Sequence, residues 1–107
     1  MSHDWFDYYP EGVEREIHFG KWNSIADALE QACKEYADKI ALTCLGSDLT
    51  YRQLDRLATD FASFLQHEVG LKKGDRLAIM LPNIMQFPIA FFAAQKIGVV
   101  CVNTTPL

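Results

Sequence analysis

Two short apolar runs near the end of the chain constrain its fold more than any other feature. Residues 76–81 and 99–102 are rich in aliphatic side chains, which is typical of strands, and 17 residues separate them. A connection of that length is long enough for a helical crossover, whereas an antiparallel hairpin needs only a few residues. The spacing therefore predicts two parallel strands joined by a helix, and with them an α/β fold class.

The second of these runs also indicates that the predicted sheet is incomplete. Residues 99–102 are apolar on both faces of a strand, which is typical of a central strand covered by helices on each side. The chain ends five residues later. We therefore expect the N-terminal portion of a larger domain, mostly of parallel strands with flanking helices.

Two amphipathic helices are predicted before these strands. The first begins at Ser24, a residue type that caps helix N-termini, and its apolar positions recur along one face as far as residue 37. The second begins at a capping box formed by Thr50 and Gln53 and is expected to end at Gly70. Its predicted buried face consists of Leu54, Leu57, Ala58, Phe61, Phe64 and Leu65. Truncation of Leu57 to Ala would then cost about 2–5 kcal/mol.

A further strand and a third helix complete the predicted elements. Residues 40–45 form a short apolar strand, and residues 46–48 form a tight turn after it. Asn83 is the expected N-cap of a helix that ends at Gly98. Pro88 is unfavourable inside that helix because its ring would clash with a preceding carbonyl, so the helix is either kinked there or begins late.

Residues 1–22 are expected to form an aromatic-rich N-terminal arm, separate from a domain at 23–107. The arm holds six of the 13 aromatic residues of the chain: Trp5, Phe6, Tyr8, Tyr9, Phe19 and Trp22. These rings can pack on the surface of a larger body or anchor the chain at a membrane interface. Five acidic residues in the arm favour packing, because anionic lipid would repel them.

Composition excludes several classes of function. The net charge is −4 and the basic residues form no stripe, so no nucleic-acid partner is expected. The longest apolar run, residues 87–94, is far shorter than the roughly 20 residues that span a bilayer. The start of the chain resembles no export signal, which favours a cytoplasmic protein. An odd number of widely spaced cysteines, Cys33, Cys44 and Cys101, predicts reduced core residues rather than disulfides or a zinc site.

No catalytic, cofactor-binding or metal-binding residue is predicted within these 107 residues. His3, His18 and His67 are isolated from one another, and no serine lies in a nucleophile elbow. Residues 70–75 contain two glycines and two lysines, but they precede a predicted strand. A phosphate-binding loop follows a strand and opens a helix, so this segment is interpreted as a solvated turn.

Three stretches of the chain together resemble the opening part of the adenylate-forming superfamily. Residues 49–54 are similar to its L-T-Y-x-E-L stretch, with Gln53 where the family usually has Glu. Residues 73–83 resemble K-G-D-R-V-A-I-x-x-P-N, and residues 96–107 resemble K-A-G-x-x-x-V-x-x-x-P-L. The order and spacing of the three stretches match the family over residues 22–107.

Within that superfamily, the arm residues 9–10 and 16–17 together with residues 35–39, 69–75 and 86–88 look most like bacterial long-chain fatty-acid CoA ligases. This resemblance implies that a fatty acid is activated with ATP and Mg2+ to an acyl-adenylate, and that the acyl group then passes to coenzyme A. It is compatible with a cytoplasmic enzyme, including one associated peripherally with the inner face of the membrane. An aryl-CoA ligase and a fatty acyl-AMP ligase that serves a carrier protein remain alternatives.

The resemblance also implies that the catalytic and nucleotide-binding motifs of the family lie beyond residue 107. The matched stretches are scaffold in that family, so the chain alone is expected to be inactive and to bind none of these cofactors. A stand-alone binding or interaction module is the hypothesis from a different functional class. In either case an unpaired sheet edge predicts self-association.

Overall fold

The computed structural model describes residues 4–18 and 20–105. The predicted arm residue Phe19, the isolated His3 and the last two residues of the third motif lie outside this description. The elements are a 3-10 helix η1 (Asp4–Tyr8), helices α1 (Ile25–Glu35), α2 (Tyr51–Phe64) and α3 (Gln86–Ile97), a π-helical turn η2 (Leu65–Val69), and strands β1 (Ile40–Cys44), β2 (Ser47–Thr50), β3 (Arg76–Ile79) and β4 (Val100–Asn103).

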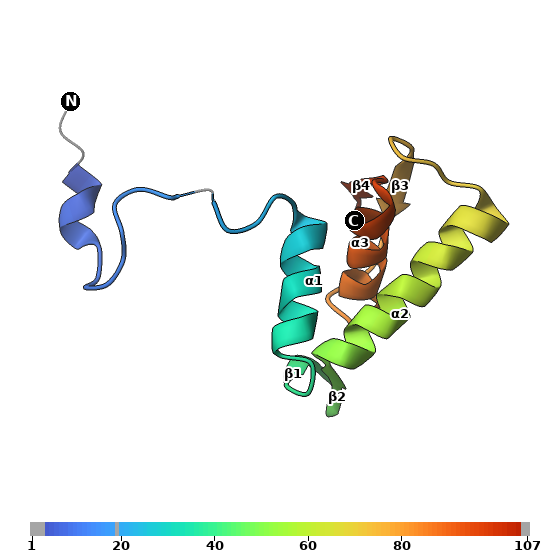
Figure 1. Cartoon of the computed structure of the whole chain (residues 1–107), viewed down its shortest axis with the longest axis horizontal. Helices are drawn as coiled ribbons and strands as arrows, with labels where there is room; N and C mark the ends of the chain where they lie inside the picture. The colour runs from blue at the N-terminus through green and yellow to red at the C-terminus, as the bar shows by residue number, and fades with distance from the viewer. Residues whose placement is uncertain (1–3, 19, 106–107) are drawn as a thin grey trace.

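The predicted α/β fold and parallel crossover are confirmed. Strands β3 and β4 run parallel with Arg76 opposite Val100, and α3 connects them. Strands β1 and β2 form a separate antiparallel pair at the opposite end of the helices (Figure 1). Strand β2 was expected as part of a turn, whereas the reversal occupies only Leu45 and Gly46, both with positive φ. Parallel pairing thus holds for one of the two sheets among the described residues.

Helix α1 begins where its cap predicts. The Asp27 backbone N–H donates to the Ser24 hydroxyl at 3.0 Å, so Ser24 is the N-cap. Leu29 and Cys33 are buried against α2, but Tyr36 at the end of the predicted stripe is exposed. The buried face of α1 is therefore narrower than its apolar periodicity indicates.

Helix α2 begins at the predicted capping box. The Gln53 backbone N–H donates to the Thr50 hydroxyl, and the Gln53 side chain accepts from the Thr50 backbone N–H. The prediction that Leu57 and Phe64 are core residues is wrong, because they are 40% and 50% exposed whereas Leu54 is 2% exposed. The buried positions follow Leu54 at intervals of four residues, through Ala58 and Ala62, and Leu57 lies to the side of that line.

Small side chains let α2 and α3 approach closely. Ala58 and Ala62 of α2 and Ala93 of α3 are buried in one apolar cluster with Leu65. Phe92 packs against this cluster and also against the one around Leu54, so its ring links the two. The resulting core lies between the helices, and β3 and β4 pack on one side of it (Figure 1).

The predicted N-cap at Asn83 is wrong, because helix α3 begins later in the chain. The first helical residue is Gln86, and Met85 precedes it without a side-chain cap. Pro88 therefore lies in the first turn of α3. Backbone N–H groups in a first turn have no acceptor within the helix, so the N–H that proline lacks is not needed there. The late start anticipated from Pro88 is confirmed, as is the end at Gly98, whose φ is 73°.

The N-terminal arm extends away from the three helices (Figure 1). None of its residues from 4 to 18 is buried, and Phe6 alone among them is half-buried. The Phe6 ring contacts Trp5 and Tyr9 edge-on, with centroid distances of 5.8 and 5.3 Å, and the Arg15 guanidinium lies over it at 5.4 Å. Trp5 and Tyr8 are therefore the rings of this segment that face solvent most, whereas Tyr9 and Phe6 are more shielded.

Candidate functional site

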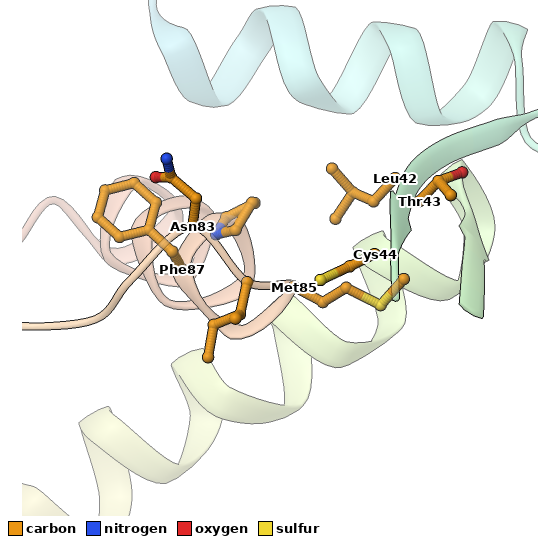
Figure 2. A pocket seen from close by; sticks show the side chains of 8 residues that line it. Leu42, Thr43, Cys44, Asn83, Met85 and Phe87 are labelled. Atoms are coloured by element: carbon orange, nitrogen blue, oxygen red, sulfur yellow. The ribbon is translucent and has the colours of Figure 1, made fainter. Parts of the chain in front are cut away.

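A recess of about 210 Å³ lies between β1 and the segment that leads into α3 (Figure 2). Strand β1 contributes one wall and the residues before and at the start of α3 contribute the other. The lining residues are Leu42, Thr43, Cys44, Asn83, Ile84, Met85, Phe87 and Pro88. These two chain segments are about 40 residues apart in the sequence, so the recess exists only in the folded chain.

The recess has few groups that could do chemistry. The Thr43 hydroxyl donates to the Asp48 carboxylate at 2.6 Å. Its proton is therefore used in a hydrogen bond within the β1–β2 hairpin. The remaining lining polar groups are the Cys44 thiol and the Asn83 amide, and neither is paired with an acid or base in the lining. The recess therefore suits apolar contact rather than bond making or breaking.

A charged contact joins α2 to α3. The Lys96 ammonium donates to the Asp55 carboxylate at 2.7 Å, and both side chains are partly buried. Burial, with a smaller contribution from the Asp55 charge, raises the pKa of the nearby Cys33 thiol. A raised pKa leaves less thiolate at neutral pH, so Cys33 is a poor nucleophile. Both features fit a structural role for this cluster.

Residues 70–75 form a turn in which most backbone N–H groups have acceptors within the chain. The Lys72 N–H donates to the Asp75 carboxylate at 2.7 Å, and the Asp75 N–H returns to the Lys72 carbonyl at 3.0 Å. The Gly74 N–H donates to the Gly98 carbonyl at 2.9 Å. Since a phosphate-binding loop presents free N–H groups, this arrangement agrees with the interpretation of the segment as a turn.

The two described histidines, His18 and His67, and the three cysteines lie on different segments of the fold. Within the described ranges, no three His, Cys, Asp or Glu side chains lie close enough together to hold a metal ion. His18 is exposed and lies 3.5 Å from Glu14 on the arm. All three cysteines are free, but only Cys33 is buried, so the expectation that Cys44 and Cys101 are also core residues is too strong.

The folded chain brings two of the three family-like stretches together. Residues 73–83 comprise the turn, β3 and the segment before α3, while residues 96–105 comprise the end of α3 and β4. They meet where Gly98 contacts the turn, and a Cβ built on Gly98 would lie 2.9 Å from the Lys73 Cγ. The predicted parallel pairing of residues 76–81 with 99–102 already brings these two stretches together, and the lack of a side chain at Gly98 allows the close approach.

No helix in the described part of the chain has the length and apolar character needed to cross a bilayer.

Comparison with known proteins identifies the class. The family model described as AMP-binding enzyme matches residues 29–107, which is most of the chain, and the chain belongs to this family. Among curated relatives, the long-chain-fatty-acid–CoA ligase of Escherichia coli O6:H1 is 40% identical over all 107 residues, which are 19% of that relative. Triostin synthetase I of Streptomyces triostinicus is 32% identical over 104 residues, again 19% of its length.

Solved structures show the same fold. The N-terminal subdomain of Klebsiella oxytoca NpsA superimposes on 77% of this chain with a TM-score of 0.73 and 29% identity, and the match covers 21% of that structure. The chain therefore spans about a fifth of both the curated relatives and the solved relative that it matches. Its fold is an α/β arrangement that those proteins contain as part of a larger whole.

The described residues do not fit the nucleotide, magnesium or coenzyme A that the resemblance implies for a whole enzyme. The recess lacks cationic side chains, and in the lysine-containing turn the backbone N–H groups of Lys72, Gly74 and Asp75 already have acceptors within the chain.

Proposed function

We propose that this chain supplies part of the scaffold of a long-chain fatty-acid CoA ligase. Such a ligase joins a fatty acid to AMP at the expense of ATP, releases pyrophosphate, and transfers the acyl group to the thiol of coenzyme A. The observation that carries the proposal is the 40% identity to the Escherichia coli ligase along the whole of this chain. The lower identity to triostin synthetase I favours a fatty-acid ligase over a peptide-synthetase adenylation unit.

The residues described above hold the scaffold together rather than act on substrate. The Thr50 capping box fixes the start of α2, and the contact between Gly74 and Gly98 fixes the turn against the end of α3. The Asp55–Lys96 pair then ties these two helices to each other. Because none of these groups faces a reacting centre in this chain, we propose that the 107 residues alone form no acyl-CoA.

A chimeric ligase tests the proposed function. The portion of the Escherichia coli O6:H1 ligase that aligns with this chain is replaced by residues 1–107, and oleoyl-CoA formation is measured with Mg2+ and ATP. We expect the chimera to retain ligase activity, because a matching scaffold leaves the rest of the enzyme in place. A chimera that is folded by circular dichroism but inactive would contradict the proposal.

A second chimera separates the leading function from the alternative. The aligned portion of triostin synthetase I is replaced in the same way, and adenylation by that protein is measured. Preserved activity in the fatty-acid ligase with impaired activity in the synthetase supports the proposal. Impaired activity in the fatty-acid ligase with preserved activity in the synthetase supports a peptide-synthetase adenylation unit instead. The isolated 107-residue chain, assayed beside both chimeras, is expected to give no acyl-CoA above background.

We also propose that the isolated chain self-associates through the edge of β4. Strand β4 pairs with β3 on one side, and the described residues provide no strand on the other. A free strand edge can pair with a second chain. Light scattering should show a mass above 12.2 kDa that rises with concentration. A single monomeric mass at high concentration would contradict this proposal.

A further inference from the structure

A second recess, of about 260 Å³, lies where the end of the N-terminal arm meets α1. Lys21 and Trp22 form one part of its lining. The other part is one face of α1, at positions 28, 31, 32 and 35, together with Tyr36 at the C-cap. This aromatic recess, as it is called below, shares no lining residue with the recess between β1 and α3.

Both rings of the aromatic recess lie beside ammonium groups of the chain itself. The Lys21 Nζ lies 4.9 Å from the centroid of the Trp22 ring, and the Lys39 Nζ lies 5.3 Å from the centroid of the Tyr36 ring. These distances are within the roughly 6 Å at which the negative face of an aromatic ring attracts a cation. Trp22 is 51% exposed and Tyr36 is 40% exposed. Both rings are therefore accessible surfaces that attract positive charge.

One carboxylate lines the aromatic recess beside the Tyr36 ring. A hydrogen bond with Glu35 raises the pKa of the Tyr36 phenol, so the phenol stays neutral at physiological pH and remains tied to that carboxylate. Gln31 also lines the recess, and its side-chain amide donates to Asp27 at 3.1 Å. Two alanines complete the helix side. The lining thus combines ring faces and a negative charge with small apolar side chains.

A quaternary ammonium group fits this combination better than a primary one. It has no N–H and needs no hydrogen-bond acceptor, whereas a primary ammonium carries three donors. Aromatic rings are the surfaces on which proteins recognise such groups. We propose that the aromatic recess binds a quaternary ammonium group, which takes the place of the Lys21 ammonium over Trp22. Free choline and the headgroup of phosphatidylcholine both carry this group.

Tryptophan fluorescence tests the proposal, because the chain contains two tryptophans. Trp5→Phe leaves Trp22 as the reporter in the 107-residue chain. Choline chloride, titrated against sodium chloride at constant ionic strength, should change the Trp22 emission and saturate at millimolar concentration. Ethanolamine, which carries a primary ammonium, should bind several-fold more weakly. A choline response that does not saturate, or equal binding of ethanolamine, would overturn the proposal.

Variants that keep the reporter locate the site. Tyr36→Leu removes one ring and Glu35→Gln removes the charge, and each should weaken choline binding by about two- to fivefold. Tyr8→Leu is the matched control, since Tyr8 is 86% exposed and lies outside the recess. Circular dichroism checks each fold, and Glu35→Gln carries the test if Tyr36→Leu unfolds. Choline affinities equal to that of Tyr8→Leu would overturn the proposal.

The displacement of Lys21 is tested separately. Lys21→Met removes the ammonium beside Trp22 and keeps an unbranched side chain, so it should tighten choline binding by about two- to fivefold. Lys34→Met is the control, because it removes the same charge from a position of α1 outside the recess. Equal effects of Lys21→Met and Lys34→Met, or weaker binding in Lys21→Met, would contradict the displacement.

Vesicles distinguish the two sources of the quaternary ammonium group. Co-sedimentation with phosphatidylcholine vesicles that free choline inhibits would assign the site to the lipid headgroup. Saturable choline binding without co-sedimentation would assign it to the free cation. Phosphatidylglycerol vesicles, which carry no ammonium group, are the control. Equal co-sedimentation with both lipids would exclude the headgroup as the source.

Discussion

The two sheets of this chain differ in how much of their structure the chain itself completes. In β1–β2, two adjacent residues make the turn, Cys44 lies opposite Ser47, and the Thr43 hydroxyl bonds Asp48 across the strands. In β3–β4, a whole helix intervenes, and only one face of the parallel pair is covered. The β1–β2 hairpin is therefore stabilised by local contacts. The parallel pair β3–β4 is stabilised by burial, and the described residues bury only one of its two faces.

The largest expected effect comes from the covered face of β3. Ile79 is 4% exposed, so Ile79→Ala should lower the free energy of unfolding by about 2–4 kcal/mol through lost burial and a cavity. Met80→Ala, one residue later and exposed, should change it by less than about 0.5 kcal/mol. Chemical denaturation of both variants measures the difference. Equal losses would remove the distinction between the two faces.

The next effect concerns the junction between α3 and β4. Gly98 has a φ of 73°, and a Cβ there would meet the Lys73 side chain. Gly98→Ala should cost about 1–2 kcal/mol, because L residues rarely adopt this conformation. Adding Lys73→Ala should restore the part of this stability that is lost through the clash. The part lost through the backbone conformation of residue 98 should remain lost. An unchanged melting temperature in Gly98→Ala would show that this junction does not hold the parallel pair.

A smaller effect is expected where the hairpin passes into α2. Thr50→Ala removes the hydroxyl that accepts from the Gln53 N–H, and should cost about 1 kcal/mol. Thr50→Ser keeps the acceptor and serves as the control in the same thermal melts. If Thr50→Ala and Thr50→Ser lose the same stability, the loss comes from the threonine methyl group in the strand. The hydroxyl cap would then contribute nothing to stability.

The smallest effect should be a gain within the hairpin. Leu45 is exposed and has a φ of 50°, a region that asparagine tolerates better than leucine. Leu45→Asn should therefore raise the free energy of unfolding by roughly 0.5 kcal/mol. Leu45→Val, whose β-branched side chain is worse in this region, should lower it. A loss of stability in Leu45→Asn would mean that the leucine side chain contributes a contact at the turn.

Sequence patterns predicted most of the elements whose signals are local, with the cap expected at Asn83 as the exception. The Thr50–Gln53 capping box, the Ser24 cap and the terminating Gly98 each act over three or four residues, and each lies where expected. The parallel strands were also predictable, because the length of the connection between them limits how they can pair. These signals do not depend on the rest of the fold.

Features that depend on packing between elements were not predictable in this way. Leu57 and Leu54 both satisfy helical periodicity, and only the position of α3 decides which one is buried. The recess between Cys44 and Met85 joins segments with no common motif, so no sequence signal could have located it. The absence of predicted catalytic residues remains a prediction, since activity is a property of a larger protein.

The central claim is that the exposed face of β3–β4, which carries Val100 and Val102, is covered in a complete AMP-binding enzyme. Maleimide reaction rates test it with Val102→Cys in the isolated chain and in the chimeric ligase, beside Leu45→Cys as an exposed reference. Burial raises the pKa of the neighbouring Cys101 thiol, so Cys101 should react slowly in both proteins. Val102 is 42% exposed and Leu45 is 97% exposed, so the account predicts that Val102→Cys reacts readily, though more slowly than Leu45→Cys, in the isolated chain and becomes protected in the chimera. Equally fast reaction of Val102→Cys in both proteins would contradict it.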